Sequence, residues 1–249
     1  MKCKVRKPFE MKQFTIAHNQ VALPVTSDAC LFGAMVDLTS TENHEHRVLD
    51  IGTGTGLLCF MLAQKHPAAT FTGIDIHQDS IAQALENRSV NPFADRIQFE
   101  LSDILTHSPN QPYHSIVCNP PFFENQWPSE DETRRLARHS NTLNLSNLVA
   151  ACTRILCNQG KLFLLYPCDD LPHTRLTLNN NHFQLLKTTF IQAHSQKKPH
   201  LVVIEAQYNP EIPSESIPAL SETIIHYTPK GKLTETATHY LKEFYSHLP

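Results

Sequence analysis

Short apolar runs alternate with longer amphipathic stretches along most of the chain, and this pattern predicts strands and helices in turn. The expected strands are Val48–Ile51, Thr70–Ile76, Ile97–Leu101, Tyr113–Cys118, Leu162–Tyr166, Phe183–Ala193 and His200–Tyr208. The expected helices are Asp28–Leu38, Leu57–Lys65, Asp79–Val90, Leu145–Cys157 and Thr234–His247. Strands that alternate with helices predict an α/β fold, with a mostly parallel sheet that helices cover on both faces.

The segment before this alternation has a different pattern. Residues 12–25 place apolar side chains at alternate positions around a polar His-Asn-Gln sequence, which predicts a hairpin. Ser27 is expected to cap the helix that follows, and residues 39–46 form a polar stretch with the features of a solvated loop. We therefore expect residues 1–40 to form an extension, made of a basic tail, a hairpin and a helix, and residues 41–249 to form the main domain.

The composition limits the class of protein. The 249 residues include 21 Lys and Arg against 24 Asp and Glu, so a protein that coats nucleic acid through overall positive charge is not expected. No apolar run approaches the roughly 18 residues that span a membrane. Seven cysteines without a Cys-x-x-Cys pair indicate reduced thiols in a cytoplasmic protein. The fifteen histidines are scattered, and no metal site is expected.

A glycine-rich turn follows the first strand of the alternation. Gly52, Gly54 and Gly56 lie between an expected strand and helix, where a ligand can approach the backbone without meeting a Cβ. Asp75 ends the next strand, 23 residues after Gly52, and an acidic side chain there can bind ribose hydroxyls. The Gly-x-Gly-x-Gly spacing resembles motif I of class I S-adenosylmethionine-dependent methyltransferases. By itself it leaves a dehydrogenase open, although dinucleotide turns usually read Gly-x-Gly-x-x-Gly.

A second motif, Asn119-Pro120-Pro121-Phe122, follows the strand that ends at Cys118. It resembles the catalytic loop of methyltransferases that modify planar amino groups, whose nitrogen is a poor nucleophile because its lone pair is delocalised. The Asn119 side-chain carbonyl and the Pro120 main-chain carbonyl can each accept one N–H, and the prolines hold both acceptors rigidly. Phe122 can stack on a flipped-out base. This chemistry requires no general base. A dehydrogenase has no use for such a motif, so the motif favours a methyltransferase over a dehydrogenase.

With these residues in place, the chain resembles the bacterial tRNA adenine-N6 methyltransferases that modify adenine 37 of a valine tRNA. The matching segments cover most of the chain and are residues 14–18, 25–34, 49–58, 91–97, 119–123 and 138–143. The resemblance implies a Rossmann-like sheet of seven strands, mostly parallel with an antiparallel last strand. It also implies S-adenosylmethionine as cofactor and tRNA as partner. One departure is Thr26-Ser27-Asp28, where the family often has Gly-Thr-Asp.

The resemblance and the motifs together nominate the site residues. The catalytic candidates are Asn119, Pro120 and Phe122, and the cofactor-binding candidates are Ser27, Asp28, Asp50, Gly52, Gly54, Asp75, Asp103 and Asn119. In this family an aspartate at the position of Asp103 faces the adenine amine, but an aspartate there could equally cap the following turn.

Basic residues are concentrated at the N-terminus. Residues 1–12 carry five basic residues against one acidic residue, a net charge of +4, which leaves −7 for the rest of the chain. The candidates for contact with RNA phosphates are Lys2, Lys4, Arg6, Lys7, Arg138, Lys197 and Lys198. A solvated end and a solvated helix face would explain the same charges. The acidic residues 128–132 would repel phosphate unless they point away from it.

Three other functions remain open at this point. A protein glutamine-amide methyltransferase uses a similar loop, most often with Tyr in place of Phe122, and a ribosomal RNA guanine-N2 methyltransferase uses the same loop. A non-catalytic RNA-binding protein on the same fold would need a damaged cofactor turn, and none is visible. Adenine-N6 methylation of tRNA by a cytoplasmic monomer is the function we expect.

Overall fold

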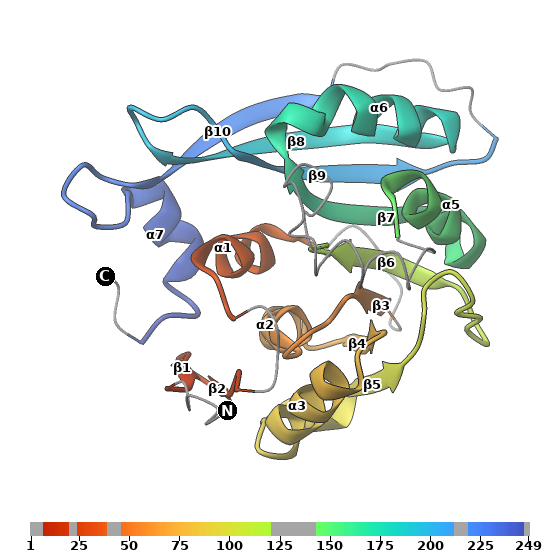
Figure 1. Ribbon diagram of the computed structural model, residues 1–249, viewed down its shortest axis with the longest axis horizontal. Coiled ribbons are helices and arrows are strands. Elements are labelled where there is room, and N and C mark those ends of the chain that lie inside the picture. The colour runs from red at the N-terminus through yellow and green to blue at the C-terminus, as the bar shows by residue number, and fades with distance from the viewer. Residues whose placement is uncertain (1–6, 20–23, 39–45, 121–142, 212–218, 247–249) are drawn as a thin grey trace, which may run out of the picture.

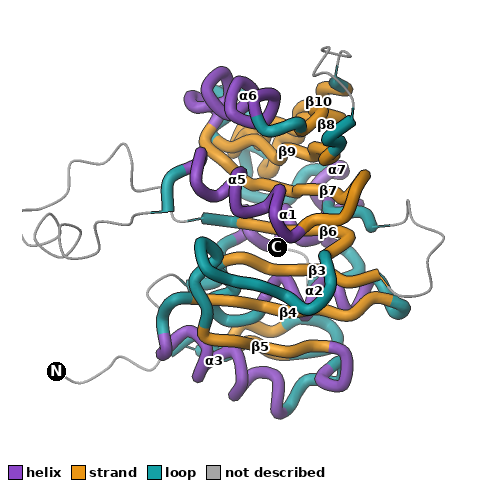
Figure 2. The backbone as a smooth tube through the Cα atoms, turned by 90° about the vertical axis from the view of Figure 1, so that its right-hand side faces the viewer, coloured by secondary structure: helices purple, strands orange, loops and turns teal. Residues whose placement is uncertain are grey.

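The structure is a computed structural model of the chain, and it describes residues 7–19, 24–38, 46–120, 143–211 and 219–246. Eight strands form one sheet in the order β10-β8-β9-β7-β6-β3-β4-β5, and Figure 2 shows them stacked in that order. The strands are β3 (His46–Ile51), β4 (Ala69–Asp75), β5 (Ile97–Leu101), β6 (Tyr113–Cys118), β7 (Leu156–Pro167), β8 (Phe183–His194), β9 (Leu201–Tyr208) and β10 (Leu220–Tyr227).

Only β9 runs against its neighbours, because it pairs antiparallel with β7 and β8 while the other pairs of this sheet are parallel. The mostly parallel α/β sheet is therefore confirmed. The predicted count of seven strands is wrong, since β10 adds an eighth strand beside β8 at the edge of the sheet.

Helices cover both faces of the sheet (Figure 1). They are α1 (Ser27–Met35), α2 (Leu57–Lys65), α3 (Gln78–Ser89), α5 (Leu145–Ile155), α6 (Leu171–Asn180) and α7 (Glu235–Leu241), with the 3-10 turns η1 (Ala94–Arg96) and η3 (Cys168–Asp170). Consecutive residues of β3 explain why the sheet is buried on both sides. Val48 belongs to the apolar cluster beneath α1, α2 and α7, whereas Leu49 belongs to the cluster beneath α5 and α6.

The N-terminal hairpin is present but lies earlier than predicted. Strands β1 (Phe9–Glu10) and β2 (Thr15–Ile16) pair antiparallel, and residues 20–23 of the predicted hairpin lie outside the described residues. The hairpin packs against the C-terminal part of the chain, where the ring of Phe9 lies 5.9 Å from that of Tyr245 and the Lys12 N–H donates to the Phe244 carbonyl at 2.7 Å.

Two local predictions are wrong. Thr26, not Ser27, caps α1, because the Thr26 hydroxyl accepts from the Ala29 N–H at 3.2 Å and Ser27 is already helical. His46 is not in a solvated loop but begins β3, where it is buried and its Nε2 lies 3.0 Å from the Ser115 hydroxyl. Burial lowers the pKa of His46 to about 4, so it is neutral at physiological pH.

Within the described residues, no helix combines the length and the apolar character that crossing a membrane requires.

Candidate active site

The three motifs singled out in the sequence meet at one edge of the sheet. Strands β6, β3 and β4 are adjacent and parallel, so their carboxyl ends lie side by side. Asp50 lies near the end of β3 with the glycine turn after it, Asp75 ends β4, and Asn119 follows β6. This carboxyl edge is where ligands bind in open parallel sheets.

The glycine turn exposes its backbone at two of its three glycines. Gly52, Gly54 and Gly56 have φ of 71°, 54° and 84°, a left-handed conformation that glycine adopts at low cost. A Cβ on Gly52 would meet nothing within 4 Å, and one on Gly54 would meet only a backbone oxygen at 3.9 Å. A Cβ on Gly56 would lie 2.6 Å from Phe99. Gly52 and Gly54 therefore leave open space for a ligand, whereas Gly56 is required by packing and by the start of α2.

Asp50 is a buried carboxyl group beneath this turn. Its Oδ2 accepts a hydrogen bond from the Thr53 hydroxyl at 2.7 Å and lies 3.6 Å from the Cys59 sulfur. Its Oδ1 is also buried, and no donor among the described residues reaches it. Burial raises the pKa of Asp50 to about 7, although the Thr53 and Cys59 hydrogen bonds oppose that shift. A buried acceptor without a donor is costly, so a cationic or hydrogen-bonding group beside the turn would stabilise the ionised form.

Asp75 is held by two backbone N–H groups. Gly54 donates to its Oδ2 at 3.1 Å and His77 donates to its Oδ1 at 2.9 Å. A carboxylate offers about four acceptor positions, so two remain for hydroxyl donors. The next residue, Ile76, is 63% exposed, and Leu101 at the end of the adjacent β5 is 56% exposed. These two apolar side chains were not nominated from the sequence, and they give the edge an apolar surface beside Asp75 on which a flat ring can pack.

Asp103 caps a turn, which is the alternative that the sequence left open. Its Oδ1 accepts from the Leu105 N–H at 2.9 Å, and its carbonyl accepts from the His107 N–H at 2.8 Å. His107 further fixes this turn, because its Nδ1 lies 3.1 Å from the Ser102 hydroxyl and its Nε2 lies 3.2 Å from the Tyr113 hydroxyl. The cap uses one carboxylate oxygen, so a ligand contact by the other stays a prediction.

Asn119 and Pro120 leave the sheet directly beside the glycine turn. Cys118 pairs with Ile51 in the parallel register, so Asn119 follows β6 at the level where Gly52 follows β3. Both Asn119 and Pro120 are half-buried. Phe122 lies outside the described residues, so its stacking role stays a prediction.

Asp28, in the first turn of α1, contacts two histidines. Asp28 Oδ2 lies 3.3 Å from His200 Nε2, and Asp28 Oδ1 lies 3.3 Å from His226 Nδ1. Burial alone would raise the pKa of Asp28, but its hydrogen bonds to the two histidines outweigh burial and hold that pKa well below its usual range. The hydrogen bond that the His200 ring donates to Asp28 raises the pKa of His200. Asp28 therefore pairs with two histidines that the sequence did not indicate as its partners. The contacts of Asp28 and Ser27 with a cofactor stay predictions.

Three of the predicted RNA-contacting residues are described, and all three are exposed: Lys7, Lys197 and Lys198. The other candidates, Lys2, Lys4, Arg6 and Arg138, lie outside the described residues, as does the acidic stretch 128–132. Six cysteines fall in the described part of the chain, and all are free thiols. In that part no group of three His, Cys, Asp or Glu side chains is placed to hold a metal ion.

Comparison with known proteins identifies relatives of this chain. The family model of the methyltransferase small domain matches residues 33–178. The chain is 32% identical to the tRNA1(Val) (adenine(37)-N6)-methyltransferase of Porphyromonas gingivalis over 96% of this chain and 94% of that protein. It is 34% identical to the Vibrio campbellii protein of the same name over 80% of this chain and 82% of that protein.

Solved structures share the fold at low sequence identity. A predicted O-methyltransferase from Agrobacterium tumefaciens superposes with a TM-score of 0.64 at 16% identity, covering 86% of this chain and 95% of that chain. A [4+2]-cyclase superposes with a TM-score of 0.53 at 14% identity, covering 74% of this chain and 81% of that chain. Because a cyclase shares the fold, the fold alone does not identify the reaction.

Proposed function

The chain belongs to the family of the tRNA1(Val) (adenine(37)-N6)-methyltransferases, and from this premise we propose that it methylates the exocyclic N6 of adenine 37 in a valine tRNA. S-adenosylmethionine is the methyl donor, and when bound it supplies the methyl group and the sulfonium leaving group. The observation that carries the proposal is the position of Asn119 and Pro120, which leave β6 immediately beside the glycine turn that follows β3.

The residues at the carboxyl edge fit this cofactor. The unsatisfied Oδ1 of buried Asp50 suits a positively charged ligand, and the open backbone at Gly52 and Gly54 leaves room for it. Asp75 would accept hydrogen bonds from the ribose hydroxyls, and exposed Ile76 would pack on the adenine ring. We also assign Ser27, Asp28, Asp103 and Asn119 to the cofactor site, on the family resemblance.

Asn119 and Pro120 would act on the substrate amine. Each carbonyl oxygen accepts one N–H of adenine N6, and this orients the nitrogen toward the methyl group and favours its change toward tetrahedral geometry. The product ammonium loses its proton to solvent or to these acceptors, so the mechanism needs no histidine. Phe122 would stack on the flipped-out adenine.

Phosphate contacts by the basic tail complete the proposal. Lys7 is exposed beside β1, and with Lys2, Lys4, Arg6 and Arg138 it would bind the RNA backbone. We propose that the enzyme works as a cytoplasmic monomer without a metal ion. Residues 1–40 would form an extension to the methyltransferase domain over residues 41–249, a division supported by the start of the main sheet at His46.

The test compares Asn119→Ala with a matched control, Asn158→Ala, whose side chain is exposed at β7. Each protein is incubated with labelled S-adenosylmethionine and valine tRNA, and the RNA is digested to nucleosides. The wild type and Asn158→Ala should yield N6-methyladenosine, and Asn119→Ala should lose at least about 100-fold in rate, in line with the loss of substrate positioning. Cofactor affinity, measured by calorimetry, should fall far less than the rate, because Asn119 is only one of the cofactor contacts proposed above.

Two outcomes would contradict the proposal. Label in N2-methylguanosine instead of N6-methyladenosine would assign the alternative reaction. Turnover retained by Asn119→Ala would remove this residue from the reacting centre.

A further inference from the structure

Two turns lie next to each other at the carboxyl edge, at the end of the strand order opposite to β4 and β5. The first turn, residues 195–200, joins β8 to β9, and the second, residues 228–233, joins β10 to α7. They are neighbours because Tyr227, the last residue of β10, pairs with His194, the last residue of β8. The second turn is brought there by β10, the strand that the sequence analysis did not predict.

Both turns are well defined by backbone hydrogen bonds. In the first, the Lys197 N–H donates to the His194 carbonyl at 2.9 Å. In the second, the Gly231 N–H donates to the Thr228 carbonyl at 2.9 Å, and the Thr228 N–H donates to the Lys232 carbonyl at 2.7 Å. Gly231 has φ of 77°, which this turn requires. The side chains of the turns therefore start from fixed backbone positions.

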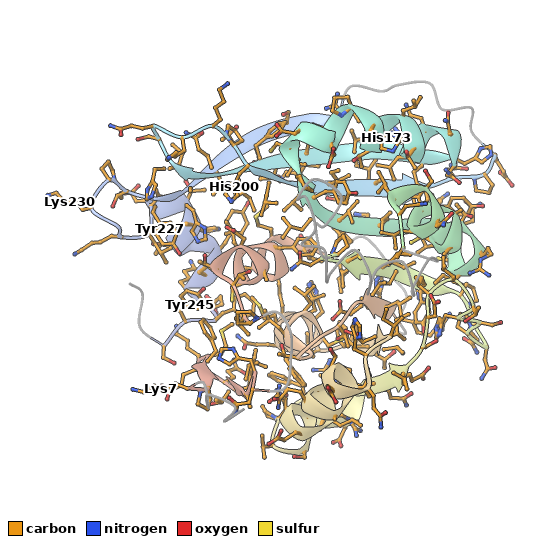
Figure 3. The ribbon with its side chains drawn as sticks, viewed as in Figure 1. Lys7, His173, His200, Tyr227, Lys230 and Tyr245 are labelled. Atoms are coloured by element: carbon orange, nitrogen blue, oxygen red, sulfur yellow. The ribbon has the colours of Figure 1, made fainter. Side chains whose placement is uncertain are left out.

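Four lysines project from these turns, and no acidic residue accompanies them within either turn. They are Lys197, Lys198, Lys230 and Lys232, all exposed, and Figure 3 shows Lys230 at the outer tip of its turn. Elsewhere Lys161 and Lys187 form ion pairs at 2.7 and 2.8 Å with glutamates, whereas in the described parts of the chain the four turn lysines form none. Their charges are available to a partner.

Asp28 connects both turns to α1. His200 closes the first turn and His226 immediately precedes Tyr227 at the start of the second, and each histidine contacts one oxygen of the Asp28 carboxylate at 3.3 Å. The ring of His226 also stacks on that of Tyr227 with centroids 4.2 Å apart. One carboxylate therefore fixes the two turns relative to each other and to the helix that begins at Ser27.

The position of the turns relative to Asn119 suits RNA that extends beyond the target base. Strand β8 is three strands from β6 and β10 is four, so at about 4.8 Å per strand the turns lie roughly 14 and 19 Å to one side of Asn119. With about 3.4 Å per nucleotide of a stacked strand, this reaches phosphates some four to six nucleotides away.

We propose that the two turns form a lysine platform, made of Lys197, Lys198, Lys230 and Lys232, that binds the phosphate backbone of the substrate RNA on one side of the target adenine. The proposal rests on the proposed function for the identity of the RNA. It adds Lys230 and Lys232 to the contact surface, and it gives β10 and Asp28 the task of placing the platform.

The test measures how affinity for a valine tRNA transcript depends on salt, by fluorescence anisotropy between about 50 and 200 mM. Each phosphate contact contributes about −0.7 to −0.9 to the slope of log affinity against log salt. Two double variants are compared with the wild type: Lys197→Ala with Lys198→Ala, and Lys230→Ala with Lys232→Ala. Each double variant should reduce the magnitude of the slope by about 1 to 2. If the slope falls by about 1.4, the ratio of wild-type to variant affinity should be about sevenfold smaller at 200 mM salt than at 50 mM.

Two controls separate charge from fold. Ser195→Ala with Gln196→Ala alters the same turn without changing charge, and Arg175→Ala removes an exposed charge from α6. Both should keep the wild-type slope, and all variants should keep the wild-type affinity for S-adenosylmethionine. An unchanged slope after replacement of all four lysines would overturn the platform. A wild type that methylates no adenine but keeps a lysine-dependent slope would refute the proposed function and leave the platform standing.

Discussion

Replacing the first and the last glycine of the turn by alanine should give two different defects. Gly52→Ala has to adopt a φ near 71°, which costs about 1–2 kcal/mol, and its methyl group meets no atom within 4 Å. Gly56→Ala incurs a similar backbone cost at φ 84°, and its methyl group would in addition lie 2.6 Å from Phe99 and 2.8 Å from Phe60. Overpacking of that kind adds about 1–3 kcal/mol.

The folded state should therefore lose about 1–2 kcal/mol in Gly52→Ala and about 2–5 kcal/mol in Gly56→Ala. Urea unfolding without cofactor measures this difference as two unequal shifts in midpoint at an unchanged m-value. Calorimetry with S-adenosylmethionine measures the second defect, because the methyl group of Gly52→Ala enters the space assigned to the cofactor. We expect at least about a tenfold loss of affinity there, equivalent to about 1.4 kcal/mol.

Either measurement can refute the reasoning. Equal destabilisation by the two substitutions would show that contact with Phe60 and Phe99 is not what requires Gly56. Wild-type cofactor affinity in Gly52→Ala would show that the ligand does not approach this part of the backbone.

Three further predictions concern carboxyl groups. Asp75→Ala should weaken cofactor binding and remove the acceptor of the Gly54 N–H, and unchanged affinity in calorimetry would rule out the ribose contact. Because burial raises the pKa of Asp50 from 3.8 to about 7, its contribution to stability is fully present below about pH 4 and is lost as the pH rises through 7. Asp50→Asn should flatten that loss in thermal unfolding of the protein without cofactor, and an equally steep loss in the variant would refute this origin. Because the pKa of Asp28 is lowered, its ion pair stabilises the folded state above pH 3.8, the ordinary pKa of the group. Because the pKa of His200 is raised, the stabilisation from this histidine is full below pH 6.5, its ordinary pKa, and is lost at higher pH. Asp28→Asn should therefore destabilise most between about pH 4 and 6.5, and a penalty independent of pH in urea unfolding would exclude the ion pair.

Two strands begin and end at the predicted residues: β6, inside the sheet, and β5, at its edge. Apolar side chains at alternate positions mark β5, and Pro120 limits β6 because proline has no N–H to donate to a neighbouring strand. Asp50, Asp75 and Asn119 were placed together because each is tied to the end of a predicted strand in a parallel sheet.

The elements that sequence missed lack an apolar repeat. Helix α6 contains Pro172 and several Thr and Asn residues, which lower helix propensity, although the proline is well placed in its first turn. Strand β10 buries only Ile224 and His226, because it lies at the edge of the sheet and one of its buried residues is polar. A strand of that kind shows no apolar alternation.

The contacts of Asp28 could not be predicted from its surroundings in the sequence. Its histidine partners lie 172 and 198 residues away, and they reach it only because β9 and β10 bring them to the start of α1. The role of the Asp103 side chain as a cap was an open alternative, and it is the hydrogen bond from the Leu105 N–H that establishes it.

The contact between Phe9 and Tyr245 has a consequence for synthesis of the chain. The β1–β2 hairpin is synthesised long before its backbone partner Phe244, so this contact cannot form until the residues between them have been translated. The strands β3, β4 and β5 lie closer together in the chain and can pair earlier.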